Sequence, residues 1–470
     1  MSQFLYSQLE QELRDRIDNG QFAPMSKLPS VREMCKLHHV SKSTVLTAYA
    51  NLIAENLIFA KAKSGYFVRQ KSDQNAPALK QPQMSQSLSE PKLISSSQVI
   101  VDIMQRGAAF DLLSNSKPDP HNETLRRCLS KALRQQKSNE QLYYDQPLGD
   151  QTLRQQLAKY IQQGGGKPSF EDVIITSGCQ HALLLSLMVS SQPGDVVAIE
   201  SPGFYGAIQL LEALGRKVLE IPSSADQGIS PSALQLAAEH WDIKVLIVSP
   251  SFSTPTGSCM PEENKLQLLA MAEQHHFTII EDDIYAELHQ STQRPRSLYS
   301  YDKQGLVIMC SSLSKALSRD LRIGWVLSKK YHQQILALKI STTMANSVSQ
   351  QQGLAMFIAQ GGLDKHLKQR RLQLIQQQET LKHLITEHLP EAKSASQPLG
   401  GMVIWLELDK HVNTLELYHS ARDIGLTITP GGLFSSQDTY QHFLRVSFSH
   451  PWTQQRISAF KSLSKLINIY

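Results

Sequence analysis

The chain has 470 residues, of which 41% are hydrophobic and 19% are charged. A chain of this length is longer than one hydrophobic core usually accommodates, which predicts a globular protein of two or three domains. No apolar run reaches the length of a membrane span, and the N-terminus lacks the pattern of a secretion signal, so we expect a cytoplasmic protein without a membrane segment. Five scattered cysteines without metal-ligand spacing predict reduced thiols and no metal site.

The formal net charge of +5 is concentrated in one short segment. Residues 27–69 hold seven Lys and Arg residues against two Glu residues, which already accounts for +5. A basic segment attached to a neutral body predicts a nucleic-acid partner for that segment alone.

The first 54 residues carry three helix patterns. Apolar residues recur at every fourth position from Leu5 to Ile17, which predicts an amphipathic helix. Ser30 and Glu33 have the spacing of a capping box that opens a second helix, and Ser41 is placed to cap a third. The inward face of the third helix is predicted to consist of Val45, Leu46, Tyr49, Leu52 and Ile53.

The second and third helices have the arrangement of a helix-turn-helix. The N-terminal end of the third helix is where such a helix meets base edges and phosphates, and it presents Ser41, Lys42, Ser43 and Thr44. The segment LIFAKAKSGYFV then predicts a two-stranded wing, with Lys61 and Lys63 at its tip beside Gly65. We therefore predict a small α+β winged helix-turn-helix. The alternative is a three-helix protein-interaction module with a basic face.

The stretch LPSVREMCKLHHVSKSTVLTAYANLIAENLIFAKAKSGYFV resembles the DNA-binding domain of GntR-family bacterial regulators. The resemblance covers nearly all of residues 5–69 and implies a double-stranded DNA operator as the partner. It places at DNA-contacting positions Arg32, Ser41, Lys42, Ser43, Thr44 and Gly65. Asn56 stands where the family often has Gly, a change that a left-handed helix end tolerates.

Residues 70–97 are rich in Gln, Ser, Pro and Lys and have no apolar periodicity. This composition predicts a flexible linker, and an ordered loop wrapped on a domain is the alternative. The sequence thus divides into a DNA-binding domain over 1–69, a linker over 70–97 and a larger domain over 98–470.

Beyond residue 100, short apolar runs alternate with helix-forming segments. The predicted strands are DVIITSG, DVVAIESPG, IKVLIVSPS, TIIEDDIY and LVIMCSS. This alternation predicts an α/β domain with a mainly parallel sheet, in which ligands gather at the C-terminal ends of the strands.

The polar groups that follow these strands suit one kind of ligand. The backbone N–H groups of the SGCQ turn, at residues 177–180, suit a phosphate. The carboxylates of EDDIY need a cation, and Phe204 could cover a flat ring. Together with the amine of Lys315 in SSLSK, these groups describe pyridoxal 5′-phosphate, PLP.

Residues from about 101 to 470 resemble a fold type I aminotransferase. The matching stretches are YYDQPLGDQTLR, IITSGCQHAL, PGDVVAIESPGFYGA, TPTG, IIEDDIY, SSLSKALSRDLRIGW and LRVSFS. The resemblance implies that Lys315 forms the Schiff base with PLP. It further implies that Asp282 pairs with the pyridinium nitrogen, that Tyr285 donates to the ring hydroxyl, and that Phe204 stacks on the ring.

The resemblance also implies how the phosphate and the ligand are held. It assigns phosphate contacts to Ser177, Gly178, Cys179, Gln180, Ser312, Ser314 and Arg322. Tyr144 would reach the phosphate of the neighbouring subunit in a homodimer, and Arg445 would clamp the carboxylate of an amino-acid-like ligand. Two departures stand out. Thr254 replaces the usual Asn near the ring hydroxyl, and Arg319-Asp320 replaces a frequent Pro-Gly.

A GntR-type domain joined to an aminotransferase-like domain is the arrangement of MocR-type regulators. The resemblance therefore implies a PLP-dependent transcriptional regulator that senses an amino compound by aldimine exchange at Lys315. One alternative is an active aminotransferase that carries a DNA-binding domain. Another is a decayed enzyme domain that only dimerises the DNA-binding domains.

Overall fold

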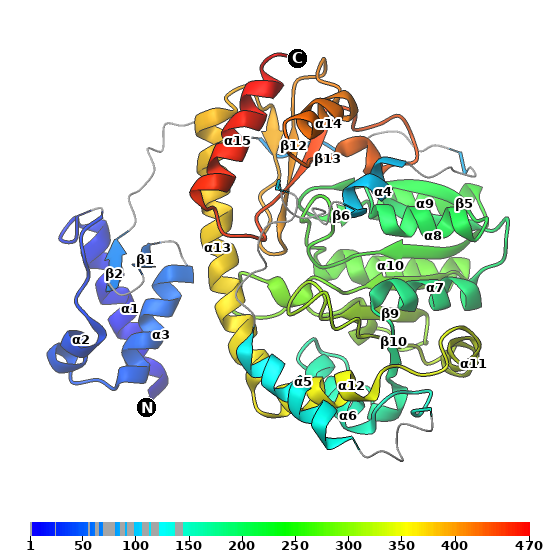
Figure 1. Cartoon of the computed structure of the whole chain (residues 1–470), viewed down its shortest axis with the longest axis horizontal. Coiled ribbons are helices and arrows are strands. Elements are labelled where there is room, and N and C mark those ends of the chain that lie inside the picture. Colours follow the sequence, from blue (N-terminus) through cyan, green and yellow to red (C-terminus); the bar gives the residue numbers. More distant parts are fainter. Residues whose placement is uncertain are drawn as a thin grey trace. The chain divides into compact units, whose positions relative to one another are not determined.

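The computed structural model describes residues 2–23, 25–54, 57–61, 65–68, 80–84, 90–91, 98–105, 112–113, 122–136 and 144–470. The chain divides into two compact units, Met1–Ala78 and Leu79–Tyr470, and each is described by itself (Figure 1). None of the described helices is long and apolar enough to cross a membrane.

The N-terminal unit combines helices with a small hairpin. Its elements are α1 (Ser2–Asp18), α2 (Val31–His38), α3 (Lys42–Ala54), β1 (Ile58–Lys61) and β2 (Gly65–Val68). The two strands pair antiparallel, with Ile58 opposite Val68 and Lys61 opposite Gly65. The prediction of three helices followed by a wing is therefore confirmed. Asn56 and Lys63, at which the sequence also pointed, lie outside the described residues.

Hydrogen bonds from side chains fix the starts of α2 and α3. Ser30 Oγ accepts from the Glu33 N–H at 3.3 Å, and Glu33 Oε2 accepts from the Ser30 N–H at 2.7 Å, so the predicted capping box is present. Ser41 Oγ accepts from the Thr44 N–H at 3.2 Å and caps α3. Between the two helices, His39 adopts a left-handed φ of +50° and ends α2.

The core of this unit corrects one prediction. The buried apolar residues come from the three helices, the hairpin and the segment before α2: Leu9, Leu13, Ile17, Leu28, Met34, Val45, Ala48, Tyr49, Leu52, Ile58 and Val68. The prediction that Leu46 belongs to this core is wrong, because its side chain is 40% exposed. Successive residues of a helix are turned by about 100°, so burying Val45 directs Leu46 away from the core.

The C-terminal unit is built on an eight-stranded sheet with the strand order β3-β10-β9-β8-β7-β4-β5-β6. The strands are β3 (Ile174–Thr176), β4 (Val196–Ser201), β5 (Lys217–Ser224), β6 (Gly228–Ile229), β7 (Ile243–Val248), β8 (Thr278–Asp282), β9 (Val307–Ser312) and β10 (Gly324–Leu327). The neighbours from β9 to β5 pair parallel, whereas β10 and β6 pair antiparallel. The predicted strands and the mainly parallel sheet are confirmed.

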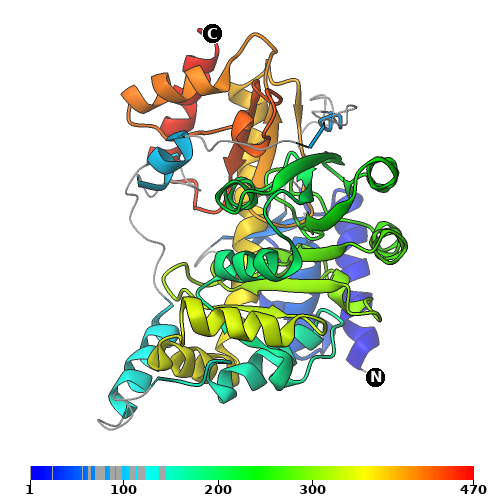
Figure 2. The ribbon, with the colours of Figure 1, turned by 90° about the vertical axis from the view of Figure 1, so that its right-hand side faces the viewer.

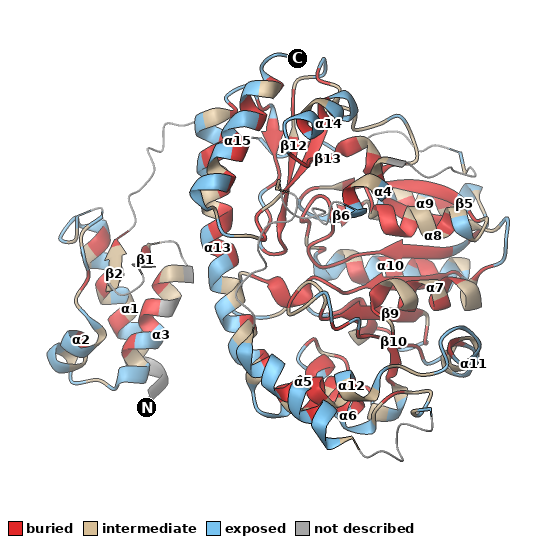
Figure 3. Cartoon of the chain, viewed as in Figure 1, coloured by how far each residue is buried: buried red, intermediate tan, exposed pale blue. Residues whose placement is uncertain are grey.

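Helices cover both faces of this sheet (Figure 2). The helices of this part of the chain are α5 (Glu123–Gln135), α6 (Gln151–Gln162), α7 (Cys179–Ser190), α8 (Tyr205–Ala213), α9 (Pro231–His240), α10 (Glu262–His275), α11 (His332–Thr342) and α12 (Val348–Ala359). Short 3-10 turns are η2 (Phe170–Asp172), η3 (Ala286–Leu288) and η4 (Leu298–Ser300). The central strands are buried along almost their whole length (Figure 3), as expected for apolar runs covered on both sides.

The long helix α13 (Gly362–His388) leads into a second, smaller sheet with the order β11-β12-β14-β13. This part consists of β11 (Ser394–Ala395), β12 (Val403–Glu407), β13 (Thr429–Pro430), β14 (Phe443–Ser447), α14 (Thr414–Asp423), α15 (Gln454–Ile467) and η5 (Gly431–Phe434), and α4 (Gln98–Gln105) precedes the large sheet in the chain. Ala395 donates its N–H to the Lys80 carbonyl at 3.0 Å. This bond ties Lys80, which lies inside the segment predicted as a linker, to the smaller sheet.

Candidate functional site

The polar residues that follow the central strands lie along one edge of the large sheet. Asp282 is the last residue of β8, and Lys315 comes three residues after the end of β9, the adjacent parallel strand. Glu200 lies near the end of β4, and Thr254 follows β7. Because these strands are neighbours in the sheet, residues from four separate motifs meet at its C-terminal edge.

The carboxylates of the EDD motif have different partners. Glu281 accepts two backbone N–H groups at 2.6 and 2.8 Å, and Asp283 forms an ion pair with the buried Arg294. Asp282, which is only 5% exposed, instead lines a pocket. Of the three acids, Asp282 is therefore the one placed to meet a cationic ligand.

The amine of Lys315 lies in a site that disfavours its positive charge. Burial, together with the nearby Arg319 and Arg445, lowers the pKa of Lys315 to about 7, whereas Asp282 opposes this shift. Burial also raises the pKa of Asp282 to about 6. Near neutral pH the site thus holds a lysine that readily becomes a neutral amine, the form that acts as a nucleophile.

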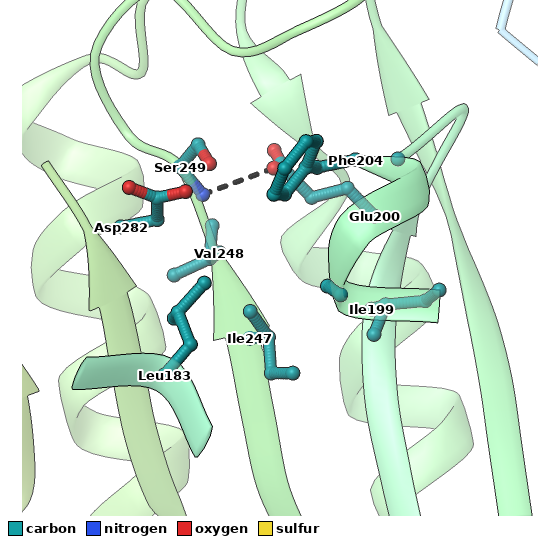
Figure 4. A pocket seen from close by; sticks show the side chains of 10 residues that line it. Leu183, Ile199, Glu200, Phe204, Ile247, Val248, Ser249 and Asp282 are labelled. Atoms are coloured by element: carbon teal, nitrogen blue, oxygen red, sulfur yellow. Dashed lines mark hydrogen bonds between the residues drawn. The ribbon is translucent and has the colours of Figure 1, made fainter. Parts of the chain in front are cut away.

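The pocket beside Asp282 has an aromatic wall and a second acid (Figure 4). Phe204, the residue before α8, is part of its lining. Glu200 Oε2 accepts from the Ser249 N–H and from Ser253 Oγ, both at 3.0 Å. Burial raises the pKa of Glu200 to about 7. The rest of the lining is mostly apolar, so the pocket suits a flat ring with few polar substituents.

The turn from β3 into α7 forms a cradle for an anion. Gly178 has a φ of +85°, and α7 begins without a side-chain cap, which leaves its first N–H groups for a ligand. Arg322 Nη2 donates to the Ser177 carbonyl at 3.1 Å. A Cβ atom on Gly178 would lie 3.0 Å from Arg322 Nη2, so glycine allows this close approach.

The side chains of the remaining residues predicted to bind the phosphate have different partners. Ser312 Oγ and Ser314 Oγ lie 2.8 Å apart, directly before Lys315. The side chain of Gln180 donates to the Gly206 carbonyl at 2.8 Å, and the thiol of Cys179 donates to Asp282 Oδ1 at 3.4 Å. Cys179 and Gln180 can therefore serve a phosphate through their backbone N–H groups while their side chains are engaged elsewhere.

Two contributors to the site were not predicted. The contact of the Cys179 thiol with Asp282 depends on side-chain direction, for which the sequence carries no signal. For Glu200 the sequence does carry a signal, because this carboxylate lies near the end of an apolar strand, as Asp282 does. Its Oε1 atom is buried and has no hydrogen-bond partner among the described residues.

The residues predicted around the ring hydroxyl are both buried. Thr254 is 3% exposed, and its hydroxyl finds no hydrogen-bond partner within the described part of the chain. Tyr285 is also 3% exposed, and burial raises the pKa of its hydroxyl. A buried hydroxyl without a partner costs free energy unless a ligand meets it. Thr254 thus fits the polar substituent of a bound ring.

Arg445 and Tyr144 lie in contrasting environments. Arg445 on β14 is 4% exposed, donates to Thr429 Oγ1 at 3.3 Å and lies with its guanidinium 5.3 Å from the ring centre of Phe434. Tyr144 is 79% exposed. A buried guanidinium beside the Lys315 amine suits a carboxylate ligand, and an exposed tyrosine is accessible to a second chain.

The residues predicted to contact DNA come from the starts of α2 and α3 and from the hairpin. Arg32 is exposed on α2, and Ser41, Lys42 and Ser43 are exposed at the start of α3. Thr44 is half-buried, and Gly65 opens β2 with a φ of +111°. The side chain of Lys61 lies outside the described residues.

Two family models match separate parts of the chain. The model described as "Bacterial regulatory proteins, gntR family" matches residues 5–68, and the model "Aminotransferase class I and II" matches residues 109–458. Among solved structures, a kynurenine aminotransferase from Pyrococcus horikoshii, in complex with PMP, has a TM-score of 0.71 and 26% identity. This likeness covers 80% of this chain and 95% of that one. The fold and PLP as the cofactor are thereby confirmed.

Full-length relatives join the same two parts. The uncharacterized HTH-type transcriptional regulator YjiR of Escherichia coli K12 is 34% identical over 469 residues, which cover 98% of both chains. The similarly described YdcR of the same organism is 31% identical, also over 98% of both chains. The chain therefore belongs to the family of GntR-type transcriptional regulators that carry an aminotransferase class I and II domain.

Proposed function

We propose that this regulator senses an amino compound at Lys315 and converts that binding into a change in DNA affinity. The observation that supports it most directly is the placement of Lys315, whose pKa burial lowers to about 7, within electrostatic reach of the buried Asp282 carboxylate. The same chain carries a basic segment that matches the GntR family model. A ligand alters DNA binding only through a difference in its affinity for the two states of the protein.

In this proposal the residues of the sheet edge hold PLP. When bound, PLP supplies a carbon that bonds to amines and a ring that withdraws electrons. Lys315 would provide the resident amine and Asp282 the partner of the ring nitrogen. Phe204 would cover the ring, and Thr254 and Tyr285 would meet its hydroxyl. The anion cradle would hold the phosphate through the backbone of residues 177–180 and through Ser312, Ser314 and Arg322.

Arg445 would select the class of effector. Its guanidinium is buried, and it acts electrostatically on Lys315. A buried guanidinium pairs well with a carboxylate that arrives with its ligand. The proposed effector is therefore a compound with a primary amine next to a carboxylate, which competes with the amine of Lys315.

The first prediction separates the two units by mutation. Lys315→Ala should remove the absorbance of the Schiff base between Lys315 and the cofactor, together with the response of DNA binding to amino compounds, because the resident amine is lost. Basal DNA affinity should stay within about tenfold, because phosphate contacts of the basic segment dominate it. Arg32→Ala should weaken DNA binding and leave the absorbance unchanged. The measurement pairs a visible spectrum with a gel-shift titration at fixed salt.

A full effector response in Lys315→Ala would contradict this mechanism. Sustained formation of keto acid from amino donors and 2-oxoglutarate by the unmodified protein would identify an aminotransferase instead.

A second prediction concerns pH. In an ordinary lysine the amine loses its proton near pH 10.4. Because burial lowers the pKa of Lys315 to about 7, protein stripped of cofactor should bind added PLP faster as the pH rises from 6 to 8 and at a constant rate above that. Stopped-flow absorbance measures the rate, with Lys315→Ala as the blank. A rate that keeps rising to pH 10 would show that Lys315 titrates like an exposed lysine.

We also propose that two chains complete each cofactor site, with Tyr144 reaching the phosphate bound by the neighbouring subunit. Tyr144 is 79% exposed and is therefore available to a second chain. A homodimer would carry two DNA-binding units and so would fit paired half-sites on DNA.

The third prediction tests this arrangement by complementation. Tyr144→Phe should weaken PLP binding about tenfold, the order expected for one lost hydrogen bond to a charged group. Mixing Tyr144→Phe with Lys315→Ala and allowing subunits to exchange should restore wild-type affinity to one site per mixed dimer. That site combines an intact Lys315 with the intact Tyr144 of the other chain. Absence of restored sites in a mixture shown to exchange would place Tyr144 in its own chain's site or outside it.

A further inference from the structure

The outward face of α3 carries an apolar group in its middle. The exposed residues of the first half of α3 are Lys42, Ser43, Leu46 and Thr47. The opposite face is buried through Val45, Ala48, Tyr49 and Leu52. Leu46 therefore lies on the same side of α3 as the polar residues at the start of the helix. It is 40% exposed because the buried face of α3 points away from it.

The hydroxyl groups on this face already have partners within the helix. Ser41 Oγ lies 2.7 Å from Ser43 Oγ and 2.8 Å from Thr44 Oγ1, and it also caps the helix. Thr47 Oγ1 donates to the Ser43 carbonyl at 3.0 Å. The hydroxyl of Thr47 is thus turned back onto the helix, which leaves its methyl group as the part of that side chain without a polar contact.

Apart from Lys42, the described exposed positions of α3 carry none of the side chains that usually read guanine and adenine. Those readers are Arg and Lys for guanine, and Asn and Gln for adenine. Asn51 is half-buried and donates to Glu10 Oε2 at 2.7 Å, so it is tied to α1. On this face Lys42 is the one described residue able to read guanine, and it lies at the end of the helix where a phosphate contact is also available.

Base pairs display one apolar group in the major groove, the 5-methyl group of thymine. A second helix of a helix-turn-helix places its N-terminal half in that groove, and the net charge of +5 over residues 27–69 draws this unit to DNA. DNA is therefore the partner that this face fits best. Thymine is the base that matches the apolar side chain of Leu46 at the middle of the face, because its methyl group is apolar.

We propose that Leu46, together with the methyl group of Thr47, reads thymine methyl groups in the operator. The proposal rests on DNA binding by the N-terminal unit and is independent of the events at Lys315. An exposed leucine is by itself unremarkable on a protein surface. Leu37, which is 60% exposed on α2, therefore provides the matched comparison.

The test uses the full-length protein with bound cofactor. Duplexes are selected from a random library at fixed salt, and each thymine of the selected site is then replaced by deoxyuridine, which lacks only the methyl group. Wild-type affinity should fall by about three- to tenfold at one or two positions in each half-site, the effect expected of one covered methyl group. Leu46→Ala should bind the unmodified site more weakly and should lose little more on replacement by deoxyuridine.

Control variants separate this reading from other causes. Leu37→Ala should keep the full sensitivity to deoxyuridine, and Lys42→Ala should lower affinity for both duplexes by the same factor. The proposal is overturned if every deoxyuridine duplex binds within twofold of its parent, or if Leu46→Ala keeps the wild-type sensitivity. Failure to select any specific duplex would overturn this proposal together with sequence-specific DNA binding. A positive selection without a methyl effect would overturn this proposal alone.

Discussion

A lysine amine and a carboxylate buried at the ends of two adjacent parallel strands form the constraint on which the C-terminal unit depends. Removal from water destabilises both charged forms, lowering the pKa of Lys315 to about 7 and raising that of Asp282 to about 6. The two groups remain there because β8 and β9 are fixed as neighbours by their apolar residues. The sheet thereby keeps a reactive amine next to a partner for a cationic ring.

The two units use charge in opposite ways. The N-terminal unit exposes its basic residues on α2 and at the start of α3, where water and salt screen them and a polyanion can displace the counterions. The C-terminal unit buries Arg445 and Asp282 and half-buries Lys315, and in this environment each charge acts strongly over a short range. DNA affinity should therefore depend on salt, whereas effector binding should depend on the fit of one small molecule.

The sequence was sufficient for the N-terminal helices and hairpin and for five strands of the large sheet, because the signals for these elements are local. Alternating apolar runs and capping residues fixed the strands around Asp282 and the start of α2 without knowledge of the rest of the chain. The prediction that Leu46 is buried fails because Val45 and Leu46 are adjacent in α3 and both are apolar. Contacts with other elements determine which of the two is buried. The pairing of Lys80 with the β11 region and the contact of Cys179 with Asp282 join distant segments, for which periodicity carries no information. The site roles came from resemblance to a family and stay predictions.

The central claim is that exchange at Lys315 changes DNA binding. Its most direct test treats the protein with borohydride, which fixes the cofactor to Lys315 through a bond that amines cannot displace. DNA affinity is then measured by gel shift for treated and untreated protein, with and without a mixture of the twenty amino acids and common polyamines. The account predicts a shift of about fivefold or more for the untreated protein, the usual lower range of allosteric coupling, and none for the treated protein. Equal shifts in both preparations would show that the effector acts at another site.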